Sequence, residues 1–111
     1  MESRIQRTLT QWFPDAFTDD NISTIRTDYD FLNHFAEYVK VLINNNCENK
    51  KEPLNIINLL YSKGTLFERN AIENAFLFVL ASDEKTQTLK ENLSIMPEPL
   101  KAVYIKTILE N

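Results

Sequence analysis

The sequence predicts an all-α protein, and both its composition and its hydrophobic pattern support this class. Its 111 residues include one glycine and four prolines, too few for the turn-rich chain of an all-β fold. Hydrophobic residues recur at spacings of three and four, which places them along one side of a helix. We therefore expect a single domain over residues 1–111, built of five to six short antiparallel helices in a compact bundle or a short stack of helical hairpins.

The first predicted helix ends before Pro14, because proline disfavours a helical residue ahead of it. Ser3 and Gln6 have the spacing of a capping box at its start. Residues 14–27 look irregular, with a short helical turn expected around Ile22. The hydrophobic stripe of this helix consists of Ile5, Leu9, Trp12 and Phe13.

Two further amphipathic helices follow. Thr27 or Asp28 can cap the second, and a polar loop at residues 44–52 separates it from the third. Pro53 fits the first turn of the third helix, where its missing N–H has no partner in any case. The apolar side of the second helix consists of Phe31, Leu32, Phe35, Ala36, Tyr38, Val39, Leu42 and Ile43, and that of the third consists of Leu54, Ile56, Ile57, Leu60 and Tyr61.

The only glycine marks the corner after the third helix. We expect Gly64 to be a left-handed residue just beyond a helix that ends at Lys63. Thr65 and Glu68 then form a capping box for the fourth helix. A phosphate-binding loop requires several glycines followed by a lysine, so this corner is interpreted as structural.

The fourth predicted helix, residues 66–81, is apolar almost all round and is therefore expected at the centre. A fifth helix carries Leu89 and Leu93, and Pro99 fits the start of a final helix. The broad face of the fourth helix consists of Phe67, Ala71, Ile72, Ala75, Phe76, Phe78 and Val79, whereas Leu66, Leu77 and Leu80 fall on its polar side.

Composition disfavours several functional classes. A net charge of −4 argues against a nucleic-acid binder, which needs cations to replace counterions on phosphate. No apolar run is long enough for a transmembrane helix, and the N-terminal residues lack a signal-peptide core, so we expect a cytoplasmic protein without a membrane partner. The single Cys47 cannot form an intramolecular disulfide or a cysteine-based metal site.

Acidic residues dominate the segment 15–37, where Arg26 is the only basic residue. One interpretation is a solvated surface, and the other is a face that attracts a basic partner. Three aromatic residues near this segment, Trp12, Phe13 and Phe17, could serve as an interface or as core. The acidic residues are Asp15, Asp19, Asp20, Asp28, Asp30 and Glu37.

Two polar groups are candidates for chemistry. His34, the only histidine, shares a helix edge with Asp30 and Glu37, but a helical di-iron site requires paired Glu-x-x-His motifs. We expect a surface histidine that pairs weakly with one of these acids, and no metal, cofactor or catalytic residue. The polar strip of the fourth helix either satisfies neighbouring groups or lines a groove that a partner enters. This strip consists of Arg69, Asn70, Glu73 and Asn74.

Three stretches resemble small all-helical bacterial proteins of unknown function, some of which occur beside secreted toxins. They are the pattern F-x-x-Y-V-x-x-L at residues 35–42, the segment LYSKGTLFERNAIENAFL and the segment LSIMPEPLKAVYIKTILEN. The resemblance and the charge pattern favour a protein-interaction module that is not an enzyme. In its concrete form this is an immunity or antitoxin-like protein that covers a basic site on a toxin. A structural homodimer and a small metal protein or enzyme centred on His34 are the alternatives.

Overall fold

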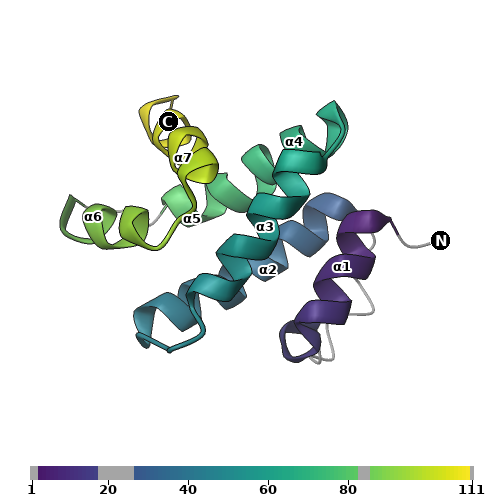
Figure 1. Ribbon diagram of the computed structural model, residues 1–111, viewed down its shortest axis with the longest axis horizontal. Coiled ribbons are helices and arrows are strands. Elements are labelled where there is room, and N and C mark those ends of the chain that lie inside the picture. The colour runs from purple at the N-terminus through teal and green to yellow at the C-terminus, as the bar shows by residue number, and fades with distance from the viewer. Residues whose placement is uncertain (1–2, 18–26, 83–85, 111) are drawn as a thin grey trace.

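The computed structural model describes residues 3–17, 27–82 and 86–110. Every regular element in these ranges is helical, which confirms the all-α class. Helices α2 (Asp28–Asn44) and α3 (Lys51–Lys63) occupy the centre, with α1 (Arg4–Trp12) on one side (Figure 1). Helices α6 (Thr86–Ser94) and α7 (Glu98–Glu110) lie at the opposite end. Within the described ranges, no helix has the length and hydropathy needed to cross a bilayer.

Capping boxes start both α2 and α4 (Leu66–Ala71); the box at α4 was predicted, whereas at α2 only a cap at Thr27 or Asp28 was expected. At α2, the Asp30 backbone N–H donates to Thr27 Oγ1 over 3.1 Å, and the Thr27 N–H donates back to Asp30 Oδ2 over 3.4 Å. At α4, Thr65 and Glu68 exchange the same pair of bonds at 3.2 and 2.8 Å. Each box satisfies two backbone donors that a helix start would otherwise leave unpaired.

Helix α1 has only half of its predicted box. Ser3 Oγ accepts the Gln6 N–H over 3.1 Å, but the Gln6 side chain turns away and donates to Asp28 Oδ1 over 3.0 Å. Pro14 ends α1 as expected and opens the short 3₁₀ helix η1 (Pro14–Phe17). The helical turn predicted around Ile22 lies outside the described residues.

The polar connection between α2 and α3 is shorter than the predicted loop at residues 44–52. Helix α2 extends through Asn44, and α3 begins at Lys51, with Pro53 in its first turn as predicted. Lys51 and Glu52 have good helix propensity, so the helix starts ahead of the proline. Asn46 makes the turn with a φ of 51°, a left-handed conformation that asparagine tolerates better than most residues.

The prediction of a left-handed Gly64 is wrong, although the position still needs glycine. Its φ of −81° and ψ of 159° are extended backbone, open to any residue. A Cβ atom here, however, would lie 2.6 Å from the Leu60 carbonyl oxygen and 3.1 Å from Glu68 Cβ. The chain turns so tightly between α3 and α4 that there is no room for a side chain, and lack of space rather than dihedral freedom explains the glycine.

The predicted fourth helix contains a π-helical turn that changes which residues are buried. Helix α4 continues into the π-helical η3 (Ile72–Leu77) and then α5 (Phe78–Ser82). A π-helical turn holds one extra residue, so later side chains lag by about 100° relative to an unbroken α-helix. Leu77 and Leu80, expected on the polar side, therefore face the core, whereas Phe78 is turned outward and is 48% exposed.

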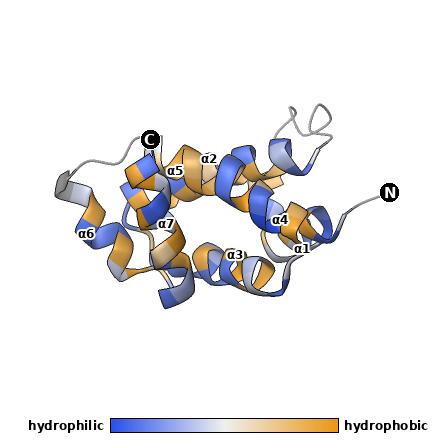
Figure 2. Ribbon diagram, turned by 90° about the horizontal axis from the view of Figure 1, so that it is seen from above, coloured by the Kyte–Doolittle hydropathy of each residue, from blue (hydrophilic) through white to orange (hydrophobic). Residues whose placement is uncertain are grey.

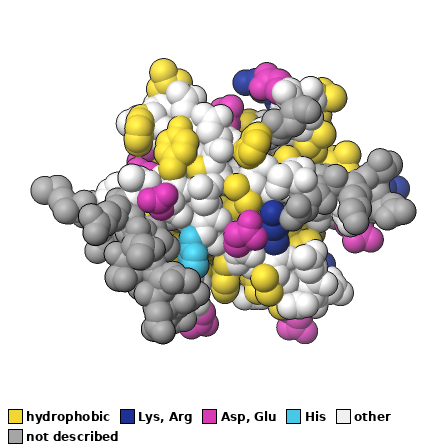
Figure 3. All heavy atoms as spheres, turned by 180° about the vertical axis from the view of Figure 1, so that it is seen from behind, with side chains coloured by type: hydrophobic (Ala, Val, Ile, Leu, Met, Phe, Trp, Pro, Cys, Tyr) yellow, Lys and Arg dark blue, Asp and Glu magenta, His cyan; other side chains and the backbone are white. Residues whose placement is uncertain are grey.

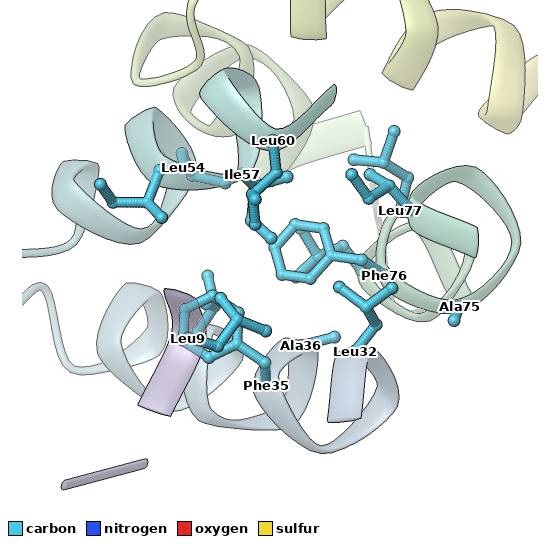
Figure 4. Close-up of a cluster of buried hydrophobic side chains, with 14 of the residues drawn as sticks. Leu9, Leu32, Phe35, Ala36, Leu54, Ile57, Leu60, Ala75, Phe76 and Leu77 are labelled. Atoms are coloured by element: carbon cyan, nitrogen blue, oxygen red, sulfur yellow. The ribbon is translucent and has the colours of Figure 1, made fainter. Parts of the chain in front are cut away.

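The core lies between two layers of helices. In Figure 2, α2 and α5 lie along one side and α3 along the other. Phe76 of η3 projects between Leu60 on α3 and Leu32 on α2 (Figure 4), and all three side chains are buried. The Phe76 ring also stacks on Phe35 with centroids 5.9 Å apart. Helix α1 completes this core through its buried Leu9.

Candidate functional site

The aromatic residues near the acidic segment separate into core and surface. Phe17 is 8% exposed and packs on Phe31 and Phe35, with ring centroids 5.1 and 6.1 Å away. Phe13 is also buried and packs on Phe35 at 5.0 Å. Trp12 is 56% exposed, although the sequence pattern placed it on the core stripe. Of the three aromatic residues considered for an interface, Trp12 therefore lies on the surface, whereas Phe13 and Phe17 belong to the core.

Two carboxylates of the acidic segment, Asp28 and the predicted site residue Asp30, form bonds within the fold. The Asp28 Oδ1 atom accepts bonds from Ser3 Oγ at 2.5 Å and Gln6 Nε2 at 3.0 Å, linking α2 to α1. The Asp30 carboxylate belongs to the capping box of α2. Asp15 and Glu37 are exposed, and Glu37 pairs with Lys40 at 3.5 Å. Asp19 and Asp20 lie outside the described residues.

On the face that carries the histidine, the described acidic side chains do not form one continuous patch (Figure 3). In Figure 3, the described acidic side chains on this face are separated by apolar and neutral surface. His34 is half-buried, and its ring packs against that of Phe17 with centroids 5.4 Å apart and planes tilted by 36°. Its Nε2 lies 2.7 Å from the Ala16 carbonyl oxygen. The carbonyl can only accept, so Nε2 carries the proton and donates, and this bond joins η1 to α2. His34 therefore bonds to backbone rather than to the acids expected from the sequence.

No metal centre is found among residues 3–17, 27–82 and 86–110, where no three His, Cys, Asp or Glu side chains gather closely enough to hold an ion. Cys47 is half-buried in the turn between α2 and α3.

The polar strip of α4 and η3 forms contacts within the fold rather than a groove. The Arg69 side chain donates to the carbonyl oxygens of Tyr61 and Ser62 over 3.1 and 3.3 Å, closing the corner after α3. Glu73 accepts a bond from the Tyr61 hydroxyl over 2.6 Å and lies 3.8 Å from Lys106 Nζ on α7. Arg69 and Glu73 thus each bond to a residue of α3. Asn70 and Asn74 are exposed on the same strip.

This corner changes the acidity of one tyrosine. Burial, first, and the hydrogen bond to the Glu73 carboxylate, second, together raise the pKa of Tyr61 to about 12, against an opposing effect of Arg69. The carboxylate accepts a hydrogen bond from the neutral phenol and disfavours a second negative charge beside it. Tyr61 is therefore a neutral hydrogen-bond donor at physiological pH.

The strongest candidate site is a groove between α1 and α3, which the sequence analysis did not identify. It has a volume of about 190 Å³ and an almost wholly apolar lining. Two large side chains in it remain exposed, Trp12 by 56% and Leu59 by 53%. We call it the α1–α3 groove; its lining consists of Arg4, Thr8 and Trp12 from α1 and Ile56, Leu59, Leu60 and Lys63 from α3.

One sequence signal for this groove was present. Leu59 lies on the outer side of α3, opposite the buried Leu54 and Ile57, so a large apolar residue stands where the pattern calls for a polar one. A single exposed leucine is common on protein surfaces, and only its place in the same groove as Trp12 makes it informative.

Cations lie at one end of the groove. Arg4 donates to the Lys63 carbonyl oxygen over 3.1 Å and to Glu68 Oε1 over 3.0 Å, which fastens the start of α1 to the end of α3. Glu68 is balanced by this contact and by its capping box. The ammonium group of Lys63 is exposed and has no ion-pair partner in the part of the chain that the structure describes. This end of the groove is therefore positive.

Fold and site together define a small all-helical protein with an exposed apolar groove. A family model described as a domain of unknown function, DUF7674, matches residues 7–110, and the chain belongs to this family. The match includes most of the α1–α3 groove, from Thr8 through Lys63. No curated protein and no solved structure matches the chain.

Proposed function

We propose that this chain is a protein-interaction module and that the α1–α3 groove is its binding surface. The observation that carries the proposal is the pair of exposed side chains, Trp12 and Leu59, that flank an apolar floor. Tryptophan is enriched among the residues that dominate binding energy at protein interfaces. An exposed apolar surface of this kind gains free energy when a partner covers it.

The size and chemistry of the groove favour a protein partner over a small molecule. Its volume of about 190 Å³ is below the roughly 300–1,000 Å³ typical of ligand pockets. It suits a few side chains of a partner. The described residues that line it include no carboxylate, histidine or cysteine, the groups that most often carry out acid, base or nucleophilic catalysis. The proposal is therefore binding without catalysis.

A charge substitution in the groove tests this proposal. Leu59→Asp places a carboxylate on the apolar surface without entering the core. Val41→Asp is the matched control, because Val41 is 56% exposed on α2 and does not line the groove. We expect tagged wild-type and Val41→Asp proteins to retain the same partner from native lysate and Leu59→Asp to lose it. A partner that is retained equally by all three proteins would contradict the assignment to the groove.

A structural homo-oligomer is the competing proposal, and it predicts a different result. If a second copy covers the groove, light scattering of the pure protein gives a concentration-dependent mass that Leu59→Asp returns to that of a monomer. A monomeric mass for the wild-type protein across the concentration range would exclude this alternative.

An immunity or antitoxin-like role is a second form of the interaction proposal, and the exposed carboxylates of Asp15 and Glu37 support it. Exposed carboxylates of this kind can steer a basic partner through long-range attraction. Reversing Asp15 and Glu37 to lysine should slow association with such a partner and weaken its salt dependence. Association that is unchanged in rate and salt dependence would remove the acidic segment from the interface.

A further inference from the structure

The α1–α3 groove has the shape of a slot between two helices that run in opposite directions. Arg4 at the start of α1 meets the end of α3 at Lys63, whereas Trp12 at the end of α1 lies across from Ile56. The lining residues of α1 follow a spacing of four, and those of α3 a spacing of three or four, so each wall is a single helical stripe. From Arg4 to Trp12 the slot is roughly 12 Å long at 1.5 Å per residue.

A slot of this length accommodates a little over two turns of another helix. Partner helices that bind in such grooves insert apolar residues spaced at i, i+3 or i+4, and i+7. An added β-strand would instead need an exposed sheet edge, and all regular elements of the described residues are helical. The walls therefore favour an amphipathic helix as the occupant.

The charge of the groove specifies the occupant further. The positive end has Lys63, which has no ion-pair partner among the described residues, and Arg4, which is partly exposed beyond its bond to Glu68. Arg69 lies close to the same end, because it donates to the carbonyl oxygens of Tyr61 and Ser62. The opposite end, at Trp12 and Ile56, is apolar. An occupant with a carboxylate beside Lys63 gains an ion pair, whereas one with a cation there is repelled.

We infer that the α1–α3 groove binds a short amphipathic helix of another protein that carries an aspartate or glutamate at the end lying against Arg4 and Lys63. This inference rests on the proposed function and names the chemical class of the partner segment. The groove selects an acidic occupant, whereas the acidic segment would attract a basic partner. The apolar residues of the helix supply affinity, and the terminal carboxylate sets its orientation.

A displayed peptide library tests the inference without knowledge of the natural partner. The probe is a phage library of helical 14-residue peptides with apolar residues fixed at i, i+4 and i+7 and all other positions randomised. It is selected in parallel on the wild-type protein, on Lys63→Glu, on Leu59→Asp and on Val41→Asp. Lys63 is exposed and forms no ion pair among the described residues, so Lys63→Glu reverses the charge at this end of the groove without removing an ion pair of the fold.

We expect the wild-type and Val41→Asp proteins to enrich peptides with a carboxylate at one end, and Lys63→Glu to enrich lysine or arginine at that position. Leu59→Asp should enrich none of these families. Binding of selected peptides is then measured from the fluorescence of Trp12, the only tryptophan of the chain, using peptides that lack tryptophan. A carboxylate-to-lysine exchange in the peptide should weaken binding about fivefold at low salt, and less at high salt.

Failure of the acidic-helix inference can be distinguished from failure of the proposal that the groove is a binding surface. Peptides that depend on Leu59 but show no charge preference would overturn the acidic-helix inference and leave the groove as a binding surface. Selection that yields no peptide dependent on Leu59, together with a native partner that also ignores Leu59, would overturn both. A dimer that Leu59→Asp dissociates would assign the groove to a second copy and likewise overturn the inference.

Discussion

Helix α1 meets its two neighbours in different ways. Toward α2 it is closed, with Leu9 fully buried and both Ser3 and Gln6 bonded to Asp28. Toward α3 it is open, and the contact of Arg4 with Lys63 and Glu68 fastens one end of a groove that leaves Trp12 exposed. The closed side uses its polar groups within the fold, whereas the open side leaves apolar surface and a cation exposed.

The largest expected effect comes from breaking the closed side. Leu9→Ala should lower the free energy of unfolding by about 3 kcal/mol, because it removes a fully buried leucine and leaves a cavity. Urea denaturation followed by circular dichroism measures this change. A loss below about 1 kcal/mol would mean that α1 is not an integral part of the core.

The polar link between α1 and α2 comes next. Asp28→Ala should cost about 2 kcal/mol, since the carboxylate accepts bonds from both Ser3 and Gln6 and these donors would lose their partner. The same urea titration measures the loss, and Glu37→Ala is the matched control on the exposed surface of α2, where we expect a change within about 0.5 kcal/mol. Equal effects of the two substitutions would contradict a structural role for Asp28.

A smaller effect is expected at high pH, near the end of α3. Because folding raises the pKa of Tyr61 to about 12, above its unfolded value of about 10, the protonated phenol favours the folded state. This stabilisation is complete below pH 10 and is lost as the pH rises through 12. Its size is reduced by the partial exposure of the side chain.

Unfolding of the wild-type protein and of Tyr61→Phe at pH 9 and pH 11.5 measures this effect. The wild-type protein should lose more stability between these values than the variant, in which the other tyrosines and the lysines still titrate. The same loss in both proteins would show that Tyr61 does not exchange its proton differently on folding.

The smallest expected effect tests the open side. Leu59→Ala should change the free energy of unfolding by no more than about 0.5 kcal/mol, because its side chain is mostly exposed in the folded protein. Both substitutions replace leucine with alanine, so a difference between their free-energy changes reflects the surroundings of the two side chains. A loss comparable to that of Leu9→Ala would mean that Leu59 packs within the fold and that the groove is closed in solution.

The sequence predicted the helices well where local chemistry determines them. The cap at Thr27, the capping box at Thr65 and the stop at Pro14 involve residues within one turn of each other, so their spacing is sufficient to find them. The apolar side of α2 was also confirmed, because an unbroken α-helix keeps a constant period.

The errors arose where the outcome depends on contacts between helices. The need for glycine at position 64 comes from the closeness of Leu60 and Glu68. The structural role of Asp28 comes from hydrogen-bond donors that lie more than twenty residues earlier in the chain. The groove has the same origin, since Trp12 and Leu59 become a site only when α1 and α3 are placed side by side. Charge counted along the sequence also does not reveal which carboxylates are bonded within the fold, as Asp28 and Asp30 are.

The π-helical turn at Ile72–Leu77 has a consequence for comparing and redesigning this family. A sequence alignment or a design template that treats Leu66–Ser82 as a single ideal helix will assign Phe78 to the interior and Leu80 to the solvent, the reverse of their positions here. Deleting one residue within the turn would restore the regular period and rotate α5 relative to α4. The tolerance of a relative to such a deletion therefore depends on its whole set of large side chains after the turn, rather than on the residue removed.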